Sequence, residues 1–251
     1  MKSVLTGMLA LIAAVGVHGS ARAAFSVTLS VQGFGSQVIV DGGAGDTNAL
    51  PNFIGAQGSI DGYNYQITAN TNPPNGGFGG QFVVQQNALV TANGVTTSPL
   101  VIVTSTDGFT TGGASPFTLQ VFNALAESNF DRGIATAATT VTPPGGGGGI
   151  TPVATVLGGS IPASAETTMR VIVSSNPFSI SNQLTITGLT LIGSEIGNPQ
   201  FNGSVTSTAT QIQATPAPAG IILALTALPL FGLMRRRRGA AAEVAPMNAP
   251  A

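Results

Sequence analysis

The sequence predicts an all-β fold, an antiparallel β-sandwich of about nine or ten strands with Ig-like or jelly-roll-like connections. Three observations predict it. Short runs of the 251-residue chain alternate between apolar and polar residues with a period of two. Gly, Asn, Pro and Asp, which favour turns, separate these runs. Helical periodicity is nearly absent, and only residues 125–132 have the pattern of a short helix.

Four segments carry the alternation most clearly, namely residues 25–31, 63–70, 117–121 and 169–173. An antiparallel sheet with one face on the core and one in water produces this pattern. The continuous apolar runs at 82–84 and 100–103 instead predict strands buried on both faces. The apolar residues occupy even-numbered positions before Gly188 and odd-numbered positions after it, so we expect a β-bulge there.

Asp-Gly and Asn-Gly pairs recur along the chain, and such pairs favour tight turns between strands. The expected turns lie at residues 41–42, 61–62, 75–76, 93–94, 107–108 and 202–203. The glycine run at 145–149 is interpreted as a loop within one domain, because the segment after it holds too few candidate strands to form a core alone. Residues 24–214 are therefore predicted to form a single sandwich.

The charge pattern of this segment excludes several classes of function. It contains eight acidic residues, two arginines and no lysine, so it lacks the basic surface that nucleic-acid binding requires. The whole chain has no cysteine or tryptophan, and its one histidine is His18. The usual ligands of zinc and copper and the usual bases for a serine nucleophile are missing, so we expect no cofactor and no enzymatic activity.

Residues 1–23 are predicted to be a secretory signal peptide. Lys2 precedes an apolar run from Val4 to Val17, and Ala21 and Ala23 occupy the small positions of an A-x-A cleavage pattern. Cleavage between Ala23 and Ala24 removes His18 from the mature chain. The protein is therefore expected to be exported.

A second apolar segment lies near the carboxyl end and predicts a transmembrane helix over residues 217–234. At about 1.5 Å per residue this helix is about 27 Å long, close to the hydrocarbon thickness of a bilayer. Four basic residues follow it directly and favour a cytoplasmic location for that end: Arg235, Arg236, Arg237 and Arg238. Residues 239–251 have the composition of a disordered tail.

Residues 215–238 resemble the PEP-CTERM sorting signal of bacterial surface proteins. Pro216 and Pro218 match the two prolines of that motif, Ala217 stands where the family has glutamate, and Ala219 and Gly220 lead into the helix. The arginine cluster matches the basic end of the signal. The resemblance implies a membrane-anchored precursor, a sorting peptidase of the exosortase type as partner, and a final location at the cell surface or in the extracellular matrix of a biofilm.

These observations favour an exported, non-enzymatic surface or matrix protein associated with exopolysaccharide. One alternative is a calcium- or glycan-binding adhesin using loops at 41–48 and 61–65, in which Asp41, Asp46 and Asn48 offer oxygen ligands to calcium. A second alternative is a glycosidase that uses two carboxylates. Its candidates are the eight acids Asp41, Asp46, Asp61, Asp107, Glu127, Asp131, Glu166 and Glu195.

Overall fold

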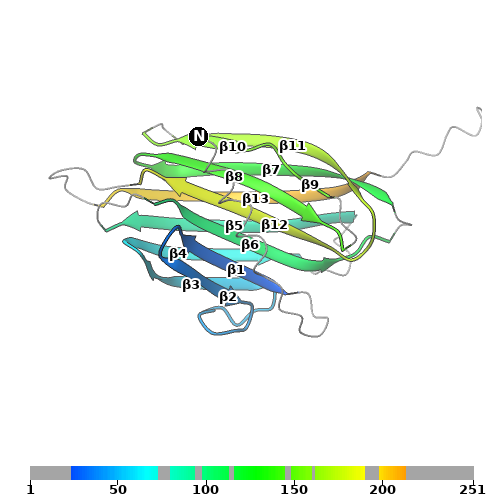
Figure 1. Ribbon diagram of the computed structural model, residues 1–251, viewed down its shortest axis with the longest axis horizontal. Coiled ribbons are helices and arrows are strands. Elements are labelled where there is room, and N and C mark those ends of the chain that lie inside the picture. The colour runs from blue at the N-terminus through cyan, green and yellow to red at the C-terminus, as the bar shows by residue number, and fades with distance from the viewer. Residues whose placement is uncertain are drawn as a thin grey trace, which may run out of the picture. The chain divides into compact units, whose positions relative to one another are not determined.

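The computed structural model describes residues 24–72, 80–93, 98–112, 116–144, 148–159, 162–189 and 198–212. These residues form thirteen strands in two antiparallel sheets (Figure 1). The all-β prediction and the antiparallel sandwich are confirmed. The strands are more numerous than the nine or ten predicted, partly because the two-residue β9 and the four-residue β10 are too short to show an alternating pattern.

The first sheet, sheet A, has seven strands in the order β10-β8-β12-β6-β1-β2, and β9 also pairs with β8. All its pairs are antiparallel. Its strands are β1 (Phe25–Val31), β2 (Gly35–Val40), β6 (Leu100–Phe109), β8 (Ile134–Thr142), β9 (Gly149–Ile150), β10 (Ala154–Leu157) and β12 (Phe178–Thr187).

The second sheet, sheet B, has six strands in the order β11-β7-β13-β5-β4-β3. They are β3 (Phe53–Ile60), β4 (Tyr63–Thr71), β5 (Gln81–Ala92), β7 (Phe117–Phe130), β11 (Ser164–Val173) and β13 (Gln200–Ile212). After the β3-β4-β5 meander the chain crosses repeatedly between the sheets, so that most sequence neighbours lie in opposite layers. Strands β2 and β3 end the two sheets on one side, and β10 and β11 end them on the other (Figure 1).

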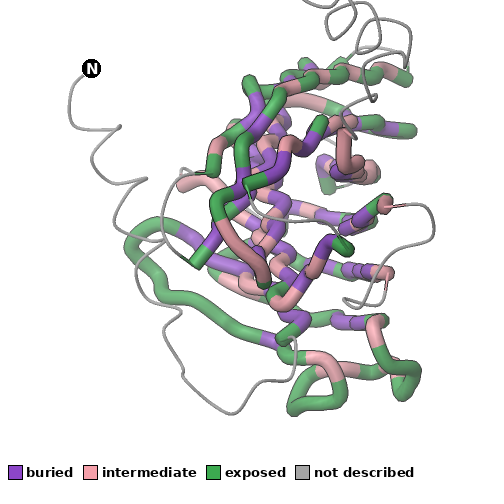
Figure 2. The backbone as a smooth tube through the Cα atoms, turned by 90° about the vertical axis from the view of Figure 1, so that its right-hand side faces the viewer, coloured by how far each residue is buried: buried purple, intermediate pink, exposed green. Residues whose placement is uncertain are grey.

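The inner faces of the two sheets bury two hydrophobic clusters. Buried positions alternate with exposed or intermediate ones along most strands (Figure 2). One cluster centres on four phenylalanines, in which the ring centroid of Phe82 lies 5.2 Å from that of Phe109 and 5.1 Å from that of Phe178. The larger cluster contains Phe130 and Phe201, whose rings meet edge to face. Such offset aromatic contacts stabilise a core beyond the area they bury.

A layer of buried polar residues lies between these two clusters. Each of six central strands contributes one of its members, which are Gln86, Thr104, Asn123, Thr139, Asn182 and Ser207, all at most 1% exposed. On each strand the residues before the polar position belong to one cluster and those after it to the other. We call this set the polar layer. It interrupts the apolar core at the middle of each of these strands.

The predicted helix at 125–132 is wrong. Residues 125–130 continue β7, with Leu125, Glu127 and Phe130 buried. Because Asn123 and Glu127 occupy inward positions, the apolar alternation is broken in the sequence even though the strand continues. The apolar runs in β5 and β6 are also buried on one face only, since Val83, Val101 and Val103 are partly exposed on the outer faces.

The expected turns have mixed outcomes. Asp61 and Gly62 both have positive φ, 40° and 76°, and form the two-residue turn between β3 and β4, as predicted. Asp107-Gly108 and Asn202-Gly203 instead lie inside β6 and β13, beside shifts of strand register. Gly188, with φ 72°, directly follows the end of β12 and is not a bulge within it. Local turn propensity therefore did not distinguish a turn from an irregularity inside a long strand.

The glycine run at 145–149 separates strands that pair with one another, since Val141 on β8 pairs with Gly149 on β9. This pairing is what a loop within one domain requires. The signal peptide at 1–23 and the segments at 215–238 and 239–251, with the sorting motif, the 217–234 helix and the arginines, lie outside the described residues. Across the described ranges no helix has the length and apolar character needed to cross a bilayer.

Candidate functional site

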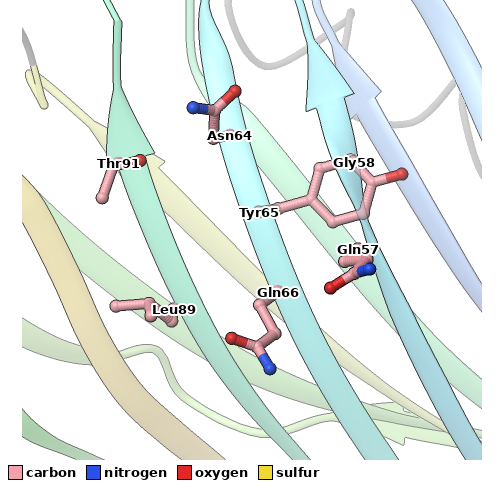
Figure 3. Close-up of a pocket in the computed structure, with 7 residues that line it drawn as sticks. All are labelled: Gln57, Gly58, Asn64, Tyr65, Gln66, Leu89 and Thr91. Carbon is pink, nitrogen blue, oxygen red and sulfur yellow. The ribbon is translucent and has the colours of Figure 1, made fainter.

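The outer face of sheet B carries a shallow hollow over β3, β4 and β5. Seven residues line it: Gln57, Gly58, Asn64, Tyr65, Gln66, Leu89 and Thr91 (Figure 3). Its volume is about 530 Å³. The lining is composed mainly of amide and hydroxyl side chains together with one leucine.

Strand register arranges these residues in two rows that run across the sheet. In the first row Gln57 pairs with Gln66, Gln66 with Leu89, and Leu89 with Asn202. In the second row the successive neighbours are Ser59, Asn64, Thr91 and Gln200. Because neighbouring strands lie about 4.8 Å apart, each row presents side chains at a regular spacing, and all of them except Leu89 are polar. We call the two rows the amide rows.

The amide rows lie on strands without any formal charge. None of β3, β4, β5 and β13 contains an acidic or basic residue. Gln57, Asn64 and Gln66 are exposed, and Leu89 is exposed enough to offer an apolar contact beside them. Amides donate and accept hydrogen bonds at once, so this surface can bind hydroxyl groups without charge pairing.

Tyr65 supports the hollow from the inner side of the sheet. Its ring extends from β4 toward Gly58 on β3 (Figure 3), and its hydroxyl donates a hydrogen bond of 2.7 Å to Oε1 of Gln37 on β2. A Cβ atom at Gly58 would lie 2.8 Å from the Tyr65 hydroxyl oxygen, so glycine is required for the ring to pass. Burial raises the pKa of the Tyr65 hydroxyl above its usual value.

The predicted calcium loop is organised by hydrogen bonds to backbone N–H groups. The Asp46 carboxylate accepts from Gly42, Asn48 and Gly55 at 2.8 to 3.0 Å. Asp41 accepts from the N–H of Asn52, and Asn48 accepts from that of Leu50. Burial works to raise the pKa of Asp46, but its three backbone donors outweigh it and hold the pKa below the usual value.

The other acidic candidates do not gather into a cluster. In the described part of the chain, no three acidic or histidine side chains are grouped so that they can hold a metal ion. Asp61 lies in the β3-β4 turn, and the buried Glu127 accepts a hydrogen bond from the N–H of Ala163 at 2.9 Å. Glu195 lies outside the described residues.

Sequence reasoning found part of the hollow. The proposed adhesin loop at 61–65 contains Asn64 and Tyr65, which line it, but Gln57, Gln66, Leu89 and Thr91 were missed. The sequence signal that could have found them is the amide side chains at those positions of the alternating runs that point away from the core. Their convergence depends on the pairing of β3, β4, β5 and β13, which residue spacing does not reveal.

No protein-family model and no curated protein matches this sequence. Among solved structures, the chain is similar to the enzymatically active domain of tailspike protein 4 of bacteriophage CBA120, with 8% identity and a TM-score of 0.34 over 64% of this chain and 19% of that chain. The chain thus spans about a fifth of the length of that protein.

Two smaller proteins also show similarity. TmCBM61 in complex with β-1,4-galactotriose matches with 8% identity and a TM-score of 0.29 over 59% of this chain and 88% of its own. The family 11 carbohydrate-binding module of the Clostridium thermocellum cellulase Lic26A-Cel5E matches with 12% identity and a TM-score of 0.27 over 69% of this chain and 96% of its own. Likeness at TM-scores of this size does not define a fold family for this chain.

Proposed function

We propose that this chain is an exported, non-enzymatic surface or matrix protein that binds a neutral, hydroxyl-rich polysaccharide across the amide rows of sheet B. The observation that carries the proposal is the pair of regular, uncharged rows that line the hollow. A neutral polysaccharide offers hydroxyl groups that both donate and accept hydrogen bonds, which matches the chemistry of Gln57, Asn64 and Gln66.

The apolar and geometric features of the hollow support the same ligand class. Leu89 lies in register between Gln66 and Asn202, where it can contact the C–H face of a sugar ring while the amides bind its hydroxyl groups. Single amide–hydroxyl hydrogen bonds contribute little in water because each replaces a bond to solvent. A repeating polymer that meets repeated rows gains affinity by making several such contacts at once.

Binding to an insoluble neutral polysaccharide tests this assignment. The full-length chain should bind cellulose or a comparable neutral glucan, and salt should have little effect because the face is uncharged. The double variant Asn64→Ala/Gln66→Ala should lose most of this binding. Gln183→Ala is the matched control, because it removes an amide from the outer face of sheet A. Equal binding by the double variant and by wild type would reject the amide rows as the site.

The location of the protein is the second part of the proposal. The signal peptide at 1–23 and the PEP-CTERM-like segment at 215–238 support export, membrane anchoring and processing by an exosortase-type peptidase. Truncation after Thr215 should release a soluble mature form whose first residue is Ala24. Recovery of the intact chain from the cytosol with Met1 retained would contradict export, whatever the result of the polysaccharide assay.

A further inference from the structure

We propose that β2 is a self-association site, at which two copies of this chain pair their β2 strands and join their sheets A into one continuous sheet. Strand β2 ends sheet A, and its six residues pair with β1 in an unbroken register from Ser26↔Val40 to Val31↔Gly35. Among the described strands β1 is its hydrogen-bonded partner, which leaves its other backbone edge open. An open edge is a template for another strand.

The corresponding edge of sheet B is blocked at one residue by the chain itself. Strand β3 ends that sheet on the same side, but the loop after β2 covers it at Gly55. The N–H of Gly55 donates to Oδ1 of Asp46 at 3.0 Å, and its carbonyl accepts from the N–H of Thr47 at 2.7 Å. Asp46 and Thr47 therefore occupy hydrogen-bonding positions that a second strand would need.

At the opposite ends of the two sheets, the edge strands β11 and β10 have other features that oppose pairing with a further strand. Strand β11 exposes Glu166 and Arg170, and charged side chains on an edge disfavour association. Strand β10 has only four residues and lies between Pro152 and the glycines at 158–159. Short edges and flanking prolines limit the hydrogen bonds that a partner strand can form.

Strand β2 lacks all of these features. Its sequence, Gly-Ser-Gln-Val-Ile-Val, contains no charge and no proline. It also exposes apolar side chains: Val38 is 50% exposed, Val40 is 45% exposed, and Phe34 in the preceding turn is 62% exposed. An uncharged, regular and β-branched edge strand favours pairing with another strand.

The exposed valines favour a second copy as the occupant, because pairing two β2 strands covers apolar side chains with apolar side chains. A two-fold axis at Val38, perpendicular to sheet A, places Val38 opposite its symmetry mate and Val40 opposite Ser36 of the second copy, with matching faces on the same side. No like charges oppose one another in this pairing because β2 has none. A charged peptide would gain no complementary ion pair from these six residues. This inference does not depend on polysaccharide binding, which involves strands of sheet B.

Engineered cysteines test the pairing directly, because the native chain contains no cysteine. Val38→Cys in the full-length exported chain should form covalent dimers with a short bismaleimide cross-linker, since opposed Cβ atoms of a hydrogen-bonded antiparallel pair lie about 5.5 Å apart, too far for an unstrained disulfide. Ile172→Cys is the matched control, because Ile172 is 68% exposed on the edge strand β11. Absence of the Val38→Cys dimer, equal yields at both positions, or cross-linking of Val38→Cys to a different protein would overturn the proposal.

A charge variant provides an independent readout in solution. Val38→Lys places two like charges opposite each other at the two-fold axis, so the dimer Kd should rise by about tenfold or more in sedimentation equilibrium. Ile172→Lys, on the edge of sheet B, should leave the Kd unchanged. Circular dichroism of both variants checks that the sheets still form. A folded Val38→Lys variant that dimerises as tightly as wild type would also overturn the proposal.

Discussion

Asn182 on β12 donates a hydrogen bond of 2.7 Å from Nδ2 to the carbonyl oxygen of Val84 on β5, and so joins the two sheets through the polar layer. The bond to Val84 fixes the orientation of the amide, so that its Oδ1 accepts from the hydroxyl of Ser207. Asn123 makes the reciprocal connection from sheet B, donating to the carbonyl of Ala137 at 3.1 Å. Sequence-distant strands are thereby held in a defined relative position.

Replacing Asn182 should reveal how much this connection contributes to the free energy of unfolding. Asn182→Ala removes the donor to the Val84 carbonyl and an acceptor of the Ser207 hydroxyl, which keeps its hydrogen bond with Thr139, and an unsatisfied buried group costs about 1–3 kcal/mol. Urea denaturation should therefore show a free energy of unfolding lower by at least this amount. Gln183→Ala, the next residue on the outer face, should change it by no more than about 0.5 kcal/mol. Similar losses for both variants would mean that the polar layer has no special role.

Asp46 should make the stability of the folded protein depend on pH in the acid range. Because the folded pKa of Asp46 lies below its unfolded value, this carboxylate stabilises the folded state at pH values above its usual pKa of 3.8. That stabilisation is lost as pH falls through the folded pKa. Thermal melts between neutral and strongly acidic pH should show a smaller acid-dependent decrease for Asp46→Ala than for wild type.

The matched control for Asp46 is Asp61→Asn, which keeps a residue compatible with the positive φ of the β3-β4 turn. Comparison with Asp61→Asn separates the effect of the Asp46 hydrogen bonds from the effect of removing one carboxylate. An unchanged acid profile in Asp46→Ala would show that its three backbone hydrogen bonds do not stabilise the folded loop.

Tyr65 should make the stability of the folded protein decrease as pH rises in the alkaline range. Its folded pKa is raised above the usual value of 10.0, so its contribution to stability is complete below that pH and is lost as pH rises through the folded pKa. Tyr65→Phe should remove this alkaline loss. At neutral pH the same variant should lower the free energy of unfolding by about 0.5–1.5 kcal/mol, because the bond to Gln37 is lost. An alkaline profile identical to that of wild type would contradict the assignment.

Gly58 and Tyr65 should be energetically coupled. A methyl group at Gly58 meets the Tyr65 hydroxyl oxygen at 2.8 Å, so Gly58→Ala should destabilise the fold by about 1–3 kcal/mol, as overpacking usually does. In a Tyr65→Phe background the hydroxyl is absent and the penalty should be smaller. A double-mutant cycle measures the difference. Strict additivity would show that the ring moves aside without cost.

Several strands could be predicted from the sequence because their signal is local. The alternation in residues 25–31 and 63–70 correctly predicted strands at β1 and most of β4, since successive side chains on a strand point to opposite faces. The predicted wet face of β1 is wrong, because Ser26 and Ser30 are also buried. The prediction of a helix at 125–132 failed because Asn123 and Glu127 are polar residues that face inward, so the apolar alternation stops while β7 continues. Their burial depends on partners such as Ala137 and Ala163 from other segments of the chain.

The sequence by itself determined that the chain between its predicted export signals is built from strands, is poor in charge and lacks the side chains of most catalytic sites. These are properties of composition and of period-two alternation, which require no knowledge of distant contacts. Only the tertiary structure decided that the amides of β3, β4 and β13 align in rows, that six polar residues form one buried layer and that β2 pairs with β1 alone among the described strands. Strand order and register bring residues far apart in sequence together, and the energies that select them come from packing and hydrogen bonding between sheets.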